Sequence, residues 1–267
     1  MFATREKLKG SGVVLFVVLG CLTSTAQNAQ PFVPDANPAR PTVATPATLT
    51  PVGYLQFETG GELAQDSPGF SNWANLNEVV KLSVHPRFEL ILPFAPVAGT
   101  KDPNITGFGG LSFGGQMVLF GTGDANTTLS ISYLHLGIGS PVPDTDIGTA
   151  SNSGLILLST NAGKFHFDTN AFFNEQISGS DNRTQFGQTL SISHPVWKLT
   201  GAGEIWHFTQ PFLHGDAVGL LWAVSYPVRK NLVVDGGFNH GLTNTSTQWE
   251  EFFGFTYLLP RKLWHSR

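Results

Sequence analysis

Apolar and polar residues alternate along most of the chain after residue 52. In 76–94, apolar residues take every second position on both sides of His85, Pro86 and Arg87, and polar residues stand between them. A period of two predicts strands with one apolar and one polar face, joined here by a tight turn. The same pattern predicts twelve strands, with almost no helical signal: 52–62, 77–85, 87–94, 108–120, 127–137, 153–161, 164–173, 185–194, 197–209, 217–226, 231–241 and 248–259.

The joints between these strands alternate in length. Short joints stand at 86, 121–126, 161–164, 194–197 and 226–231, and the joints between them are mostly longer and polar. Short turns at one end and longer loops at the other are typical of a barrel in the bacterial outer membrane, where the short turns face the periplasm. Twelve strands also return the C-terminus to the end where the barrel begins.

The polar face of the strands indicates which side points inward. A small core in water could not bury so many polar side chains without partners. Lipid outside and a polar lumen inside satisfy both faces. We therefore predict an all-β fold, a transmembrane antiparallel up-and-down β-barrel of about twelve strands, whose lumen-facing residues include Glu58, Lys81, Glu89, Gln116, His166, Asp168, Asn170, Asp235, Asn239 and Glu250.

Large aromatic residues cluster near the predicted strand ends with lipid-facing parity, as in the aromatic girdles of membrane barrels. Phe88, Trp197 and Tyr226 are examples close to the short turns. Phe120 has lumen parity instead, and Trp206 is also out of phase, for which a β-bulge is one explanation.

Composition narrows the class of protein further. Charged residues make up 13% of the chain and aromatic residues 12%, with 30 glycines. Such low charge is unusual for a surface in water and suits a surface in lipid. Residues 27–267 carry 12 basic and 18 acidic side chains, a formal charge of about −6, which argues against binding nucleic acid.

The N-terminus resembles an export signal. Three basic residues precede an apolar run that is too short to span a membrane, and small residues up to Ala26 follow it. We expect a signal peptide at 1–26, a Pro/Ala/Thr-rich extended periplasmic leader at 27–51 and an outer-membrane barrel at 52–267. Alternatively, Cys21 is a lipidated cysteine, since the three residues before it resemble a lipobox. Cys21 is the only cysteine, so cleavage after Ala26 would leave no disulfide or cysteine metal ligand.

Several segments are similar to those of a known family. They are 78–94, 106–120, 160–173 and above all 229–259, where Asp235, Phe238 and Asn239 precede Gly-Leu-Thr. Together they resemble outer-membrane β-barrel proteins classed as transporters of the "MetA-pathway of phenol degradation". The resemblance spans about 52–259 and implies a barrel that passes small, often aromatic or hydrophobic, compounds. It implies no catalytic residues, and the chain runs past the family's usual aromatic end.

The function predicted from these features is diffusion of small molecules through a polar lumen, with selectivity set by the charged lumen residues. The leader or a long loop could fold inward as a plug. Alternatives are a non-conducting structural barrel whose charges pair with one another, or a barrel enzyme acting on lipids. His166 and Asp168 share a face and could hold a metal or a catalytic proton, but an ordinary lumen position explains them better. We predict no catalytic residue, metal or cofactor. The expected partners are membrane lipid, the solute and the barrel-assembly machinery.

Overall fold

The computed structural model describes residues 33–122, 125–142, 145–146, 150–178, 180–213 and 215–264. The expected signal peptide, Cys21 and the first part of the leader lie outside these residues and stay predictions. No helix in the described part of the chain is long and apolar enough to cross a membrane. The strands are β1 Leu55–Ser67, β2 Phe70–His85, β3 Phe88–Lys101, β4 Ile105–Gly107, β5 Leu111–Phe120, β6 Thr127–Ile138, β7 Ala150–Ala162, β8 Phe165–Ser178, β9 Asp181–Val196, β10 Leu199–Thr209, β11 Asp216–Arg229, β12 Leu232–Gly241 and β13 Trp249–Leu258.

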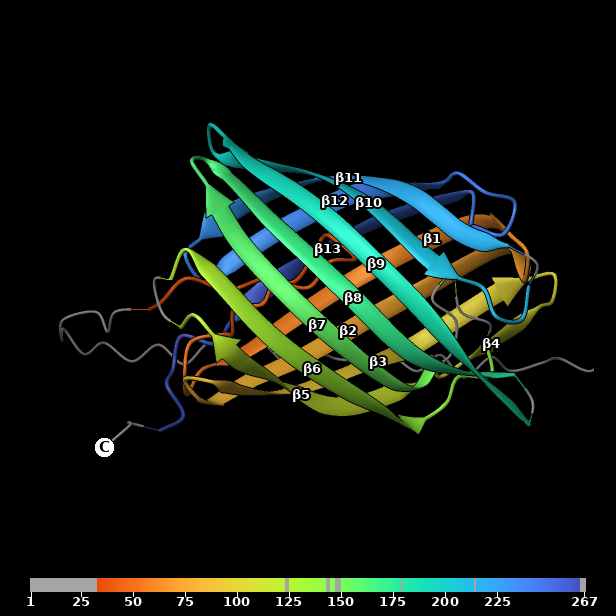
Figure 1. Cartoon of the computed structure of the whole chain (residues 1–267), viewed down its shortest axis with the longest axis horizontal. Coiled ribbons are helices and arrows are strands. Elements are labelled where there is room, and N and C mark those ends of the chain that lie inside the picture. Colours follow the sequence, from red (N-terminus) through yellow and green to blue (C-terminus); the bar gives the residue numbers. More distant parts are fainter. Residues whose placement is uncertain are drawn as a thin grey trace, which may run out of the picture. The chain divides into compact units, whose positions relative to one another are not determined.

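Twelve of these strands form a closed antiparallel barrel (Figure 1). Each pairs with the next in sequence, β3 pairs with β5, and β13 closes the ring on β1 from Gln56↔Leu258 to Gln65↔Trp249. The short β4 pairs only with β3 and lies outside the ring order. The predicted fold class and strand count are therefore confirmed.

The two faces of the wall follow the predicted alternation. In β1, Gln56 and Glu58 are buried on the inside, with exposed fractions of 0% and 2%. In β3, Phe88, Leu90 and Leu92 are exposed on the outside, with Glu89 buried between them. Buried amides and carboxyls beside exposed aromatic and aliphatic residues reverse the order of a protein folded in water. The outside of the barrel is thus suited to an apolar medium.

The positions of Trp206 and Phe120 differ from those that the predicted alternation and its exceptions gave. Trp206 is buried on the lumen side, and β10 keeps an unbroken register with both neighbours, so no bulge explains its position. Its ring occupies the space that a Cβ on Gly219 would need, 2.2 Å away. Phe120 was predicted to face the lumen but is 64% exposed, because the register with β6 shifts between Val118 and Phe120.

Several loops are shorter than predicted because the strands extend farther. β1 and β2 pair as far as Ser67 with Phe70, so only Pro68 and Gly69 connect them. β8 and β9 pair as far as Ser178 with Asp181. Ladder hydrogen bonds need no apolar side chains, so a hairpin can continue past the apolar belt. Longer connections remain at the same end of the barrel, at 139–149, 210–215 and 242–248.

Residues 33–50, which we call the lumen segment, lie inside the barrel. Their hydrogen-bond partners are on β1, β2, β3, β5, β6, β7, β8, β10, β12 and β13. Only a segment within the ring can reach strands on all sides of it. Residues 33–50 therefore have the inward fold that was the alternative to an extended periplasmic leader. The proline-rich composition gave no helical or strand period, but it did not reveal the partners on the wall.

Candidate functional site

The lumen segment is held through its backbone by polar side chains of the wall. At its beginning, the Asn37 N–H donates to Gln56 Oε1 at 2.9 Å, and Gln56 Nε2 donates back to the Asn37 carbonyl at 2.7 Å. The Ala39 N–H donates to the carboxyl oxygens of Glu58 at 3.2 and 3.3 Å, and Lys81 Nζ contacts Glu58 Oε1 at 2.6 Å. Glu58 and Lys81 therefore form a buried ion pair that also anchors the segment.

The middle of the segment is fixed by β8 and β10. The Val43 and Ala44 N–H groups donate to the two carboxyl oxygens of Glu204 at 2.9 and 2.8 Å. The Thr45 N–H donates to Asn170 Oδ1 at 2.6 Å, and Asn170 Nδ2 donates to the Thr45 carbonyl at 2.9 Å. Paired contacts of this kind resemble a strand ladder made by side chains, so the backbone of a segment without secondary structure is still satisfied.

Farther along the segment, hydroxyl groups of the wall bind its backbone. Ser130 Oγ donates to the Ala47 carbonyl at 2.5 Å, and the Ala47 N–H donates to Ser159 Oγ at 2.7 Å. Ser159 Oγ in turn donates to Asp168 Oδ1 at 2.5 Å, and His166 Nε2 lies 3.1 Å from Asp168 Oδ2. The His166 and Asp168 pair thus supports the segment through Ser159.

The segment ends at Thr50, next to β2 and β3. The Thr50 N–H donates to Glu89 Oε2 at 2.8 Å, and its hydroxyl also contacts Glu89. Ser83 Oγ donates to the same carboxyl oxygen at 2.9 Å. Gly53, with φ of 82°, then turns the chain toward β1. Glu89 therefore binds the point where the segment joins the barrel wall.

Arg40 extends from the segment across the lumen. Its Nε donates to Asp235 Oδ1 at 3.3 Å, and its Nη1 lies 4.0 Å from Glu62 Oε1. The guanidinium passes directly over two glycines of the wall, since a Cβ on Gly60 or Gly254 would lie 2.2 or 2.8 Å from it. Glycine is needed at these positions for Arg40 to approach the backbone.

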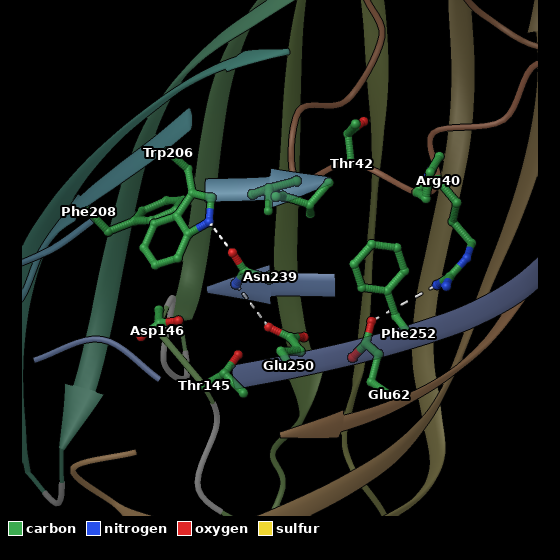
Figure 2. A pocket seen from close by; sticks show the side chains of 13 residues that line it. Arg40, Thr42, Glu62, Thr145, Asp146, Trp206, Phe208, Asn239, Glu250 and Phe252 are labelled. Atoms are coloured by element: carbon green, nitrogen blue, oxygen red, sulfur yellow. Dashed lines mark hydrogen bonds and ion pairs between the residues drawn. The ribbon is translucent and has the colours of Figure 1, made fainter. Parts of the chain in front are cut away.

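The segment leaves two cavities of about 260 and 430 Å³ in the lumen. Both are lined by Arg40, Thr42 and Glu62, but they lie against different arcs of the wall. Figure 2 shows the smaller one, where Trp206 Nε1 donates to Asn239 Oδ1 at 2.8 Å and Asn239 Nδ2 donates to Glu250 Oε2 at 3.2 Å. The larger one adds side chains of β2, β3, β5 and β6. Both cavities therefore border the Arg40 side chain.

Thr145 and Asp146, which lie between β6 and β7 in the sequence, also line the smaller cavity. Asp146 Oδ1 accepts the Thr247 N–H at 2.7 Å, and its carbonyl accepts Gln210 Nε2 at 2.5 Å. Burial raises the pKa of the Asp146 carboxyl to about 6. Val142 of the same connection packs against Phe70 and Trp73. The lumen therefore contains Asp146 in addition to the lumen segment.

The predicted lumen residues take two different places in the structure. Asn239 and Glu250 line the smaller cavity, while most of the others hold the lumen segment, directly or through a neighbour. Among the latter, Gln116 Nε2 donates to the Pro46 carbonyl at 3.1 Å. Whether any of the ten lines a solute path stays a prediction. Sequence reasoning did not select Arg40, Glu62, Asp146, Glu204 or Trp206. Strand parity could have found Glu62 and Glu204, but no sequence signal places Arg40 or Asp146.

In the described part of the chain, no hydroxyl group is hydrogen-bonded to the His166 imidazole, although Ser193 stands opposite it on β9. The Ser159 hydroxyl donates to Asp168 and not to the imidazole, whose other nitrogen lies 2.7 Å from Asn161 Oδ1. An activated serine needs a direct contact with its base. Among the described residues, no group of three or more His, Cys, Asp or Glu side chains is placed to hold a metal.

Comparison with known proteins supports the fold and not a family. No family model matches the chain, and no curated protein does. An outer membrane channel from Pseudomonas putida F1 aligns with a TM-score of 0.58 over 80% of this chain and 98% of that one, at 11% identity. The chain has the fold of an outer-membrane porin. The NanC porin, with a TM-score of 0.53 and 10% identity, covers 77% of this chain and 100% of its own. The KdgM porin in complex with disordered oligogalacturonate aligns with a TM-score of 0.51 and 12% identity, over 76% of this chain and 98% of that one. The resemblance to the phenol-degradation transporters is not confirmed.

Proposed function

We propose that this protein is a channel of the bacterial outer membrane that passes small molecules by diffusion through a lumen narrowed by residues 33–50. The apolar exterior supports the membrane location, since exposed Phe, Leu, Val and Trp side chains surround a closed ring without free sheet edges. The porin fold supports the channel role. Insertion by the barrel-assembly machinery belongs to the same proposal.

The observation that carries the proposal is the lumen segment itself. Its backbone groups are bound by wall side chains that would otherwise face water, yet two cavities remain on either side of Arg40. Both cavities border Arg40, Thr42 and Glu62, so the proposed path of a solute runs past the Arg40 side chain. The two cavities are small, so the proposed path suits small solutes and not oligomers.

The charge of the lumen favours cations. Among the described residues that face the lumen, the basic side chains are Arg40 and Lys81 together with the titratable His166. The acidic ones are Glu58, Glu62, Glu89, Asp146, Asp168, Glu204, Asp235 and Glu250. An excess of carboxyl groups in a pore of low dielectric selects for cations. Rings of Trp206, Phe208 and Phe252 at the smaller cavity support the further proposal that the solutes include aromatic compounds.

Single-channel recording in planar bilayers tests this function. We expect the full mature protein to give a small conductance, with a reversal potential in a KCl gradient that indicates K⁺ over Cl⁻. A chain lacking residues 33–50 should conduct several times more, because the lumen is then bounded by the wall alone.

The non-conducting barrel remains the second candidate function, and one observation favours it. Glu58, Glu204, Asn170 and Glu89 bind the chain's own backbone, as expected of a lumen filled for stability. Absence of conductance both in the full protein and in the chain without residues 33–50, with both shown to be folded, would establish this alternative and refute the channel.

A further inference from the structure

The 260 Å³ cavity combines aromatic rings with carboxyl groups. Trp206, Phe208 and Phe252 contribute rings, and Glu62, Asp146 and Glu250 contribute carboxyl groups (Figure 2). Its volume is just below the range of about 300–1,000 Å³ typical of sites for drug-sized ligands. The cavity therefore has the size for a molecule of one ring with a short substituent.

The charge balance of the cavity leaves two carboxyl groups without a cation. Among the lining residues, Arg40 is the only basic one, and it is already shared by Asp235 at 3.3 Å and Glu62 at 4.0 Å. No basic side chain of the described residues lies within ion-pair distance of Asp146 or Glu250. A buried carboxyl without a partner is costly to ionise, and a ligand cation would remove that cost.

Glu250 is held with one oxygen available to a ligand. The Trp206 indole N–H fixes the Asn239 amide by donating to its oxygen at 2.8 Å, so the amide nitrogen faces Glu250 and donates to Oε2 at 3.2 Å. Oε1 of Glu250 accepts no hydrogen bond from the described residues. Trp206 is itself locked, because its ring lies where a side chain on Gly219 would stand. The carboxyl group is therefore oriented before any ligand arrives.

We propose that this cavity is a binding site for a small organic cation in which an ammonium group is attached to a flat apolar body. The ammonium donates to Glu250 Oε1 and lies near Asp146, and the body packs against Trp206 and Phe252. The faces of these rings add cation–π attraction, which is strongest where water is excluded. The same groups disfavour a carboxylate ligand, since three carboxyl groups face the cavity and its single guanidinium is occupied. The proposal concerns binding and does not require that the molecule crosses the barrel.

Isothermal titration of the full mature protein in detergent tests the site with three matched probes. These are phenethylammonium, the neutral 2-phenylethanol and the anionic phenylacetate. We expect phenethylammonium to bind at least about tenfold more tightly than 2-phenylethanol, since a hydrogen bond to a charged group is the difference between them, and phenylacetate to bind least. Equal affinity for the ammonium and the alcohol, or tightest binding of phenylacetate, would overturn the proposal.

A variant places the effect at this cavity. Glu250→Gln keeps the side-chain shape and an acceptor for Asn239 but removes the charge, and it should weaken phenethylammonium at least about tenfold while leaving 2-phenylethanol unchanged. Glu251→Gln changes the adjacent, exposed residue of β13 and should alter neither affinity. Unchanged ammonium binding in folded Glu250→Gln would contradict the site, and if that variant does not fold, the probe series on the natural protein decides. Conductance is measured separately, so a failure here leaves the channel proposal standing.

Discussion

Glu204 offers the sharpest test of how firmly residues 33–50 are held. The residue is 4% exposed, and its carboxyl group accepts hydrogen bonds from the N–H groups of both Val43 and Ala44. Glu204→Gln keeps the length of the side chain, but an amide has only one acceptor oxygen and turns its NH₂ group toward the second N–H. One hydrogen bond is then lost and one buried N–H is left unpaired, a cost of about 1–3 kcal/mol.

That cost acts on the equilibrium between the bound and the detached segment. It should raise the detached fraction about 5- to 150-fold. A Thr42→Cys background reports this fraction, because Thr42 lines both cavities and the mature chain is expected to contain no other cysteine. The rate of labelling by a bulky maleimide should rise by the same factor when the segment detaches and rebinds quickly relative to labelling.

Glu251→Gln in the same background is the control, since Glu251 is exposed and lies on β13, whereas Glu204 lies on β10. Its labelling rate should equal that of the Thr42→Cys protein alone. If folded Glu204→Gln is labelled no faster than this control, the two hydrogen bonds do not hold the segment, and the reasoning from the lumen contacts is wrong.

Two further predictions follow from the packing. Gly60→Val should displace the Arg40 guanidinium, because a Cβ at residue 60 would lie 2.2 Å from it, and should leave the nearly buried Asp235 without its cation. We expect the free energy of unfolding in urea to fall by about 3 kcal/mol or more. Gly201→Val, which has open space around its Cβ position, should leave this free energy almost unchanged. The raised pKa of Asp146 means that the folded protein binds this proton more tightly than the unfolded chain, so the stabilisation is complete below about pH 4 and is lost as pH rises through about 6. Asp146 should thus make the free energy of unfolding about 3 kcal/mol larger at low pH than at high pH. Urea unfolding at pH 4.5 and pH 7.5 should show a smaller pH dependence of this free energy in Asp146→Asn. An identical pH dependence in the variant would exclude Asp146 as the source of the effect.

Local periodicity accounts for most of the wall. Twelve strands, their order and the two faces follow from alternation, because each residue of a strand points opposite to the one before it and the medium on each side selects its chemistry. Strand ends were less well determined, as at Ser67 and Ser178, since hairpins continue into polar sequence through backbone hydrogen bonds alone.

Local pattern could not place the contents of the lumen. The lumen residues Glu58, Glu89 and Asn170 were recognisable as inward-facing, but their partners lie 19, 39 and 125 residues away in the sequence. Nothing in the proline-rich stretch of 33–50 marks its backbone as the ligand of those side chains. Similarly, the local pattern of β10 does not explain an aromatic residue on the lumen face at Trp206. The space for its ring is provided by Gly219, which belongs to the next strand.

The sequence by itself thus determined the barrel, because a strand's two faces are set by residues two apart and by the solvents they meet. Only the tertiary structure decided what the barrel contains. The segment at 33–50 enters the ring because closing twelve strands brings Glu58, Glu89, Asn170 and Glu204 around one volume, where each carboxyl or amide group needs a partner. The cavity between Trp206, Glu250 and Asp146 likewise exists only after β10, β13 and the β6–β7 connection meet.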